Sequence, residues 1–503
     1  MSAAAESPRF DPARRRAVLF ALILVTALAS FESTVVSTAM PTIIGDLNGL
    51  GLYSWVFSMY LLTSTVSMPV YGRLADIHGR RRLLLLAILL FLLGALACAL
   101  SRSMTQLIAA RGLQGLGAGG LMPIALTVSG DLYSLEERAR IQGLFSTVWG
   151  LASLIGPLLG AGMTVAFGWR SIFSINLPLG LIAFFLVATK MVESRAKLAD
   201  PIDLAGAALL GAGVTALLFS VLQKAGAGSF PLAARLGLFV LGVSCLVAFA
   251  RLQMRRTHPL VPPELFRRME TAAPYLGGIL LGTTIYGVDT FVPLFVQGAR
   301  GGTAGAAGAV VTPLVLGWAV SAALAARFLV RAGFRRTARV GAALIVLGFT
   351  ALFGAALLDA PVVFISLSCA FIGFGLGPSS ISQVLAIQNS APERIRGVAT
   401  SLVPFFRTVG GSIGVGLLGG ILAAGLTHRL GDAAENAGRL LTHQEAAIAS
   451  GGADLPAADL RRAIERSLLP VFGVLWGLAV LNVVVTRGFP ERAAKSLEAT
   501  AAP

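Results

Sequence analysis

Four charged side chains fall well inside long apolar segments of the 503-residue chain: Glu32, Arg111, Asp289 and Arg407. A charged side chain inside a membrane is costly, so such a residue is a functional candidate by default. A carboxyl group in that environment can bind and release a proton or attract a cation, and a nearby guanidinium favours its charged form. These residue types therefore favour proton or cation handling.

Glu32 and Asp289 occupy equivalent positions in two segments, each 15 residues after the start of an apolar run. At a rise of about 1.5 Å per residue, both are expected roughly 22 Å from the same membrane face. The expected depths of Glu32 and Arg111 differ by only about 5 Å, so these two residues can form a contact. Either a proton-coupling site or a permanent ion pair between helices is compatible with that contact. Arg407, about 12 Å deep, can extend its guanidinium to the membrane surface or pair across helices.

The composition indicates that membrane-spanning segments position these residues. The chain is 56% hydrophobic and only 13% charged, about half the charge content of a soluble protein, which argues against a water-soluble globule. Fourteen runs are long enough to cross a bilayer. They lie at 17–40, 53–72, 83–101, 106–130, 141–166, 172–191, 203–222, 236–251, 274–297, 305–326, 338–358, 361–385, 399–425 and 468–487.

The basic residues are distributed unevenly between the loops on the two sides. If residues 1–16 are cytoplasmic, the inner loops and tails hold 28 of the 40 Lys and Arg residues. The positive-inside rule then places the N-terminus and the tail 488–503 in the cytoplasm. This distribution explains the net charge of +16 without nucleic acid. The first apolar run is too long for a signal-peptide core and is expected to be a retained span.

An internal repeat divides the spans into two groups of six. Arg73 and Gly79 recur as Arg327 and Gly333 at an offset of 254, and a glycine-rich run at 115–120 recurs at 373–377. We expect bundles at 17–192 and 274–487, an inserted pair at 203–252, and an outer loop at 427–467 in the second bundle. Duplicated helical halves are the basis of alternating access in transporters.

Residues for other chemistry are scarce. The three cysteines, Cys98, Cys245 and Cys369, lie in apolar runs and predict neither a disulfide framework nor a metal site. The four histidines, His78, His258, His428 and His443, are expected in loops and unpaired. We therefore expect no cofactor and no metal, and an intramembrane transferase or a non-transporting sensor is a weaker interpretation than a transporter.

Five sequence patterns resemble those of the major facilitator superfamily, and in particular its fourteen-span drug:proton antiporters. They are the loop Gly72–Arg82, the fourth-span pattern Leu107–Gly117, the fifth-span antiporter pattern Gly150–Ala161, the Trp169–Gly180 stretch before span six, and Glu32–Pro41 in span one. The resemblance implies an all-α membrane fold with two six-helix bundles and two inserted linker helices.

The resemblance also implies residue roles. It places Arg111 and Gln114 at positions that the family associates with proton coupling. Together with Glu32 and Asp289, the two acids inside spans, they are expected to couple protons or bind substrate. Gating is expected of Gly72, Arg73, Asp76, Gly79 and Arg80, the antiporter motif comprises Gly150, Gly156, Pro157 and Gly160, and Arg407 is a further buried charge. Asp76 can accept from arginines or from the N-terminus of a helix in the other half. That latch would favour an outward-open state. The glycines permit close helix contact, and Pro157 is expected to bend its helix.

Two departures from the family pattern stand out. Glu32 and Ser37 occupy positions where the fourteen-span branch usually has Asp and Asn, and Val330 stands opposite Asp76 in the repeated loop. We expect a monomeric antiporter of a bacterial plasma membrane that exchanges protons for lipophilic, cationic or amphipathic compounds, as in multidrug efflux and antibiotic resistance. The alternative is a proton-coupled lipid or glycolipid exporter of the same fold.

Overall fold

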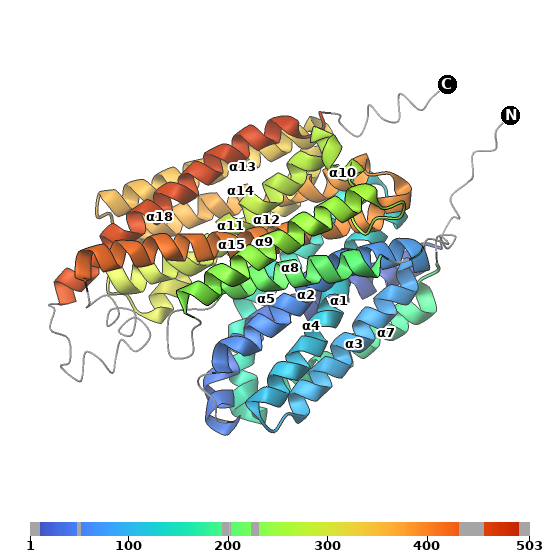
Figure 1. Ribbon diagram of the computed structural model, residues 1–503, viewed down its shortest axis with the longest axis horizontal. Helices are drawn as coiled ribbons and strands as arrows, with labels where there is room; N and C mark the ends of the chain where they lie inside the picture. The colour runs from blue at the N-terminus through green and yellow to red at the C-terminus, as the bar shows by residue number, and fades with distance from the viewer. Residues whose placement is uncertain are drawn as a thin grey trace.

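Long helices lie side by side in the computed structural model, which describes residues 11–47, 52–193, 201, 203–222, 231–431 and 457–491 (Figure 1). Within these ranges helices are the only regular secondary structure, which confirms the expected all-α class. The first helix begins and the last long helix ends at the same end of the molecule. We call this the terminal end and the opposite one the far end.

The first half contains seven helical segments. They are α1 (Pro12–Leu47), α2 (Tyr53–His78), α3 (Arg80–Leu100), α4 (Met104–Leu132), α5 (Leu135–Phe167), α6 (Ser171–Ser174) and α7 (Asn176–Lys190). The short α6 and α7 together form the sixth expected span. Pro178 contributes to the break between them, because it has no N–H to donate to the carbonyl of Ser174.

The second half contains six long helices. They are α11 (Met269–Leu294), continued by the π-helix η2 (Phe295–Ala299), α12 (Ala304–Ala332), α13 (Phe334–Leu357), α14 (Val362–Ser390), α15 (Arg396–Leu430) and α18 (Ala457–Val485), with short 3-10 turns η3 (Glu393–Ile395) and η4 (Thr486–Gly488). The ends of the expected loop 427–467 are helical, and 432–456 lie outside the described residues.

The positions of two histidines differ from the prediction. His78 is the last residue of α2 and His428 lies in the last turn of α15, so both belong to helices rather than loops. Each helix extends beyond its apolar run because its end projects into the polar region at the membrane surface, where apolar composition no longer marks a helix. His443 is outside the described residues.

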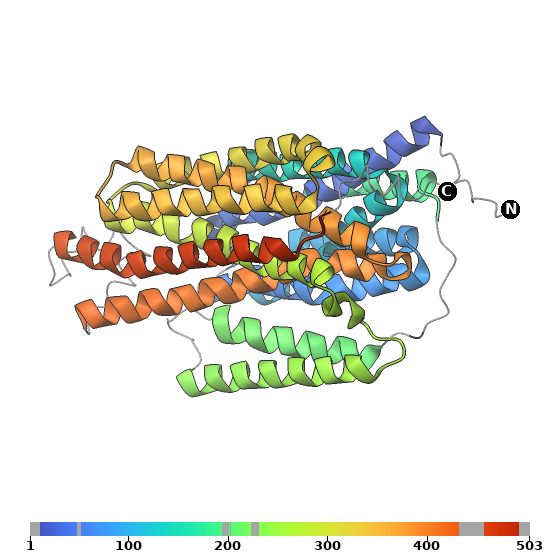
Figure 2. The ribbon, with the colours of Figure 1, turned by 90° about the horizontal axis from the view of Figure 1, so that it is seen from above.

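The inserted pair, α8 (Leu204–Leu222) and α9 (Leu232–Arg255), forms a separate layer beside the two halves (Figure 2). Helix α8 packs on α2 and α15, and α9 packs on α8. At the terminal end of the pair, the buried Asp203 carboxylate accepts from the Gly206 amide at 2.9 Å and from Gln253 Nε2 at 2.7 Å. The short α10 (Glu264–Arg267) leads into the second half.

Each of the fourteen expected spans corresponds to a helix. In the described residues, eleven helical segments are long and apolar enough to cross a membrane, and α8 is a shorter apolar helix. The remaining two, α2 and α4, are more polar: α2 carries several Ser, Thr and Tyr residues, and α4 is rich in glycine. The chain is a multi-pass membrane protein.

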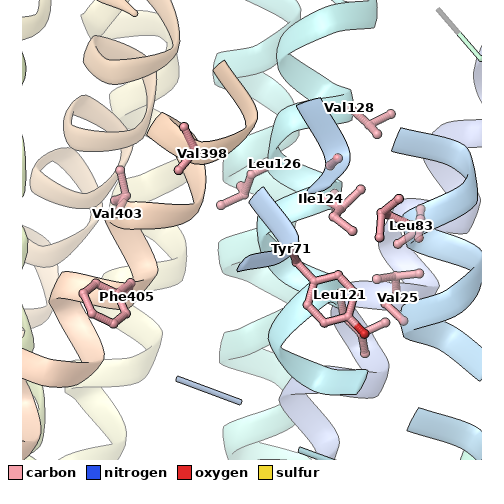
Figure 3. Close-up of a cluster of buried hydrophobic side chains, with 14 of the residues drawn as sticks. Val25, Tyr71, Leu83, Leu121, Ile124, Leu126, Val128, Val398, Val403 and Phe405 are labelled. Carbon is pink, nitrogen blue, oxygen red and sulfur yellow. The ribbon is translucent and has the colours of Figure 1, made fainter. Parts of the chain in front are cut away.

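The largest buried apolar cluster joins the two halves near the terminal end. Leu126 on α4 lies in one cluster with Val398, Val403 and Phe405 on α15, and Tyr71 on α2 belongs to the same cluster (Figure 3). This cluster couples the packing of the halves on that side of the molecule.

Contacts between the halves are concentrated from the middle of the molecule to the terminal end. Helix α2 packs on α15 and α5 on α12, and a Cβ added to Gly150 would lie 2.9 Å from Ala319 Cβ. Near the far end of α5, Leu158 and Val165 are 74% and 89% exposed. Figure 1 shows the two groups of helices diverging toward that end. The halves are therefore closed against each other at the terminal end and separated at the far end.

Candidate functional site

Glu32 and Arg111 meet as an ion pair inside the first half. Arg111 Nη1 donates to Glu32 Oε1, and both side chains are about 2% exposed. The other carboxylate oxygen, Oε2, accepts from Asn176 Nδ2 at 2.9 Å. Helices α1, α4 and α7 thus converge on one carboxylate, and each of its oxygens has a donor from a different helix.

The Arg111 guanidinium has several partners besides Glu32. It donates from Nη1 to Gln114 Oε1 at 2.8 Å and from Nε to the Val56 carbonyl at 3.3 Å. Its Cζ lies 4.1 Å from the centre of the Tyr60 ring, within the range of a cation–π contact. This group therefore links α4 to α2 as well as to α1.

Gln114 lies fully buried between Arg111 and Cys98. Its Oε1 also accepts from Cys98 Sγ at 3.6 Å, while its Nε2 has no hydrogen-bond partner in the described structure. Buried amide groups are usually satisfied, so this site contains one unused donor next to the ion pair.

Close helix contact positions the pair. A Cβ added to Gly94 on α3 would lie 2.6 Å from Gln114 Cβ, so the glycine lets α3 approach α4. On α5, a Cβ at Gly156 or Gly160 would overlap the hydroxyl of Thr34 or Thr38 on α1. Two glycines of the antiporter motif thus set the position of α1, which carries Glu32.

The other two residues of that motif behave differently. Gly150 faces α12 of the second half, so its small size permits contact between halves. Pro157 is exposed, and α5 continues through it from Leu135 to Phe167. The glycines of the motif therefore permit close packing of α5 on α1 inside the first half and of α5 on α12 between the halves.

Asp289 has no equivalent ion pair. Its side chain is exposed near the end of α11, and it forms no hydrogen bond or ion pair with the residues that the structure describes. The position that corresponds to Arg111 at an offset of 258 is Cys369, a buried neutral residue of α14. The two carboxyl groups have equivalent positions in sequence and opposite environments.

Arg407 lies on α15, partly buried. Its Nη2 donates to Gln383 Oε1 on α14 at 3.2 Å, and its Nε has no partner in the described structure. Its described side-chain hydrogen bond therefore connects α15 to α14.

Asp76 joins the two halves at the terminal end. Its Oδ1 accepts from the Gly397 amide and its Oδ2 from the Val398 amide, both at 2.9 Å. These amides belong to the first turn of α15, where unpaired N–H groups and the helix dipole favour an anion. Arg80 Nη2 also donates to Asp76 Oδ1 at 2.6 Å.

Asp131 extends this network. It accepts from Arg80 Nε at 3.0 Å and from Arg396 Nη1 of the second half at 3.1 Å. Nearby, Gln388 Nε2 of α14 donates to the Leu126 carbonyl of α4 at 2.8 Å. Three separate polar contacts therefore cross between the halves at this end.

The remaining loop residues shape this contact. A Cβ at Gly72 would lie 2.7 Å from Ser401 Cβ of α15, so only glycine allows this approach of α2. Gly79 separates α2 from α3 with a φ of 96°. Arg73 is buried beside them, at 5% exposure.

Several residues of the site were not predicted as such from the sequence. Asn176 lies inside the Trp169–Gly180 stretch, but nothing in its type distinguished it from other motif positions. Asp131 directly follows an apolar run and precedes the basic residues Arg138 and Arg140, which is a signal that could have marked it as a partner for arginines. Tyr60 and Cys98 have no signal in sequence, because their roles depend on which helix faces contact α4.

The described helices form a multi-pass membrane protein with a charged pair buried inside it. The model of the Major Facilitator Superfamily matches residues 22–415, and the chain belongs to this superfamily. It is 33% identical to the multidrug transporter protein MdtP of Bacillus subtilis over 82% of this chain and 76% of that protein. It is 30% identical to multidrug resistance protein 3 of the same organism, over 83% and 81%.

Solved structures show the same fold at low sequence identity. The human organic anion transporter MFSD10 superposes with a TM-score of 0.64 at 14% identity, over 95% of this chain and all of that one. The proton:xylose symporter XylE superposes with a TM-score of 0.62 at 13% identity, over 97% and 100%. These two structures confirm the expected fold, and the match to the family model confirms the expected superfamily.

Proposed function

We propose that this protein is a proton-coupled antiporter that exports lipophilic, cationic or amphipathic compounds by alternating access, as in multidrug efflux. The observation that carries the proposal is the buried Glu32–Arg111 pair, in which a carboxyl group lies inside membrane-spanning helices. Two relatives that match most of the chain are named for multidrug transport or resistance, which supports this substrate class.

In this mechanism Glu32 carries the proton. Protonation removes the charge that attracts Arg111 and so changes the contact between α1 and α4, and deprotonation restores it. Asp289, exposed and without a described partner, is available to a cationic substrate. Proton entry from outside then favours substrate release, and proton loss to the inside favours substrate binding.

The Asp76 network supports alternating access. Its hydrogen bonds to α15 hold the halves together at the terminal end while the far end is separated. The uneven distribution of Lys and Arg favours a cytoplasmic terminal end. We therefore assign this conformation as outward-open, in a monomer that lies in a bacterial-type plasma membrane with both termini inside.

Flux in proteoliposomes tests the proposal. With tetraphenylphosphonium as the probe and an imposed pH gradient, we expect Glu32→Gln to lower proton-driven flux by at least about tenfold, because the buried titratable group is lost. Asp289→Asn is expected to weaken probe binding. The matched control is Glu136→Gln, an exposed acid of α5. Undiminished proton-driven flux in Glu32→Gln would contradict the proposal.

The same assay distinguishes the alternative substrate class. Proton-driven movement of a fluorescent glycolipid, with no movement of tetraphenylphosphonium, would favour the lipid exporter. Movement of the cation without the glycolipid favours the proposed function.

A further inference from the structure

We propose that Asn176 is a positioning residue that fixes where the proton binds on Glu32 and stabilises both protonation states of that carboxyl group. The inference rests on the proposed role of Glu32 as the proton site. Asn176 is the first residue of α7, is 3% exposed, and donates from Nδ2 to Glu32 Oε2 at 2.9 Å.

The two carboxylate oxygens of Glu32 have chemically different neighbours. Oε1 faces Arg111, and a guanidinium has donors but no acceptor. Oε2 faces an amide, which has both. A protonated carboxyl group must donate its O–H. Of the two groups that hydrogen-bond to these oxygens in the described residues, only Asn176 can accept it, by rotation of the amide so that its carbonyl oxygen replaces the NH₂ group. The proton therefore resides on Oε2.

The proton balance of this step is simple. A proton from water forms an O–H bond at Oε2 and no other covalent bond changes. On release that O–H bond breaks and the proton returns to water on the other side. Asn176 exchanges a donated hydrogen bond for an accepted one and remains neutral throughout.

Besides Arg111, which pairs with Oε1, the titratable neighbours of Glu32 contact other residues. Arg111 on α4, Tyr60 on α2 and Cys98 on α3 lie within electrostatic reach of Glu32. Tyr60 stacks on Arg111, and Cys98 donates to Gln114. Helices α5, α6 and α7 also pack on α1. Among the described residues of these three helices, the group that hydrogen-bonds to Glu32 Oε2 is the neutral amide of Asn176.

The segment that carries Asn176 is tied to α1 at a second point. Near the far end of α1, Asp46 Oδ2 accepts from Trp169 Nε1 at 2.8 Å and from Arg170 Nη1 at 2.9 Å. The turn before α6 and the start of α7 are thus both attached to the helix of Glu32. This double attachment holds the amide in place when Glu32 changes charge.

The test is the pH profile of tetraphenylphosphonium flux in full-length protein. Asn176→Leu removes the donor to the carboxylate, so Glu32 should bind its proton more tightly. We expect the midpoint to move to higher pH by about 0.5 to 1 unit, since a hydrogen bond to a charged group is stronger than one to a neutral group. Asn176→Asp keeps the volume and places a second carboxyl group at the proton, so the upward shift should be larger.

Asn482→Leu is the matched control, because Asn482 is a buried asparagine of α18 in the other half. It should leave the midpoint unchanged. A uniform loss of rate in Asn176→Leu with the wild-type midpoint would overturn the inference, as would a wild-type midpoint in the isosteric Asn176→Asp. If Glu32→Gln retains proton-driven flux, the proposed function itself fails. If only the Asn176 variants keep the wild-type profile, this inference fails alone.

Discussion

At the scale of single residues, Gly79 is required for two reasons, its backbone conformation and the lack of space for a side chain. Its φ of 96° lies in the region that favours glycine. A Cβ would also overlap the carboxyl group of Glu193, whose Oε1 accepts from the Arg80 amide at 2.8 Å. Glu193 thus caps the first turn of α3 from beyond the end of α7. The glycine allows both the turn and the cap.

We expect Gly79→Ala to lower the free energy of unfolding by about 1 to 3 kcal/mol, because the alanine is strained at this φ and displaces Glu193. Thermal unfolding of the purified protein in detergent measures the change as a lower Tm. Gly162→Ala is the control, since a Cβ there meets no atom within 4 Å. Equal Tm values for the two variants would show that the turn tolerates a side chain.

At the scale of helices, the first half binds the N-terminus of α15 through hydrogen bonds from its backbone amides. Asp76 accepts from two successive amides of its first turn and from Arg80. Charge-assisted hydrogen bonds of this kind are stronger than neutral ones, and they add to the apolar packing of α2 on α15. The contact between these helices therefore depends strongly on the charge of one residue.

Asp76→Asn should weaken this latch, because one carboxylate acceptor becomes an NH₂ donor that faces other donors. With Ser401→Cys as a reporter in the buried α2–α15 contact, maleimide labelling from the terminal side should be ~10-fold faster. Glu136→Gln with the same reporter should leave the rate unchanged. Slow labelling in both variants would mean that apolar packing alone keeps this end closed.

At the scale of the whole molecule, the net charge of +16 reflects an excess of Lys and Arg in the loops expected on one side of the membrane. The basic loops cluster at the terminal end, where Arg80 and Arg396 also form part of the network between halves. The same end of the protein thus carries many basic loop residues and the polar contacts between the halves. This arrangement predicts that the closed end faces the cytoplasm.

An impermeant maleimide applied to intact cells checks this orientation. Arg102→Cys, exposed at the far end between α3 and α4, should be labelled, whereas Arg82→Cys, exposed at the terminal end, should be labelled only after permeabilisation. The unsubstituted chain gives the background labelling, which Cys245 can contribute because it is partly exposed, whereas Cys98 and Cys369 are buried. The reverse pattern would invert the proposed direction of transport.

The sequence by itself determined the membrane-spanning segments and which charges lie within them, and its internal repeat predicts a division into two related halves. Apolar runs and a rise of about 1.5 Å per residue give the depth of a residue such as Glu32 directly. That depth was enough to allow the contact with Arg111 that the structure shows. It also gave Asp289 an equivalent depth in the second half.

Only the tertiary structure decided the partners. Asn176 reaches Glu32 from 144 positions away, and Asp76 meets the Gly397 amide across 321. Asp289, predicted as the symmetry mate of Glu32, is exposed and has no partner in the described structure. The rotation of a helix about its axis depends on the side chains of every helix packed on it, and sequence periodicity is weak in helices that are apolar on nearly all sides. The depth of a residue in the membrane therefore follows from the local sequence, whereas the direction in which its side chain points depends on the packing of the whole helix bundle.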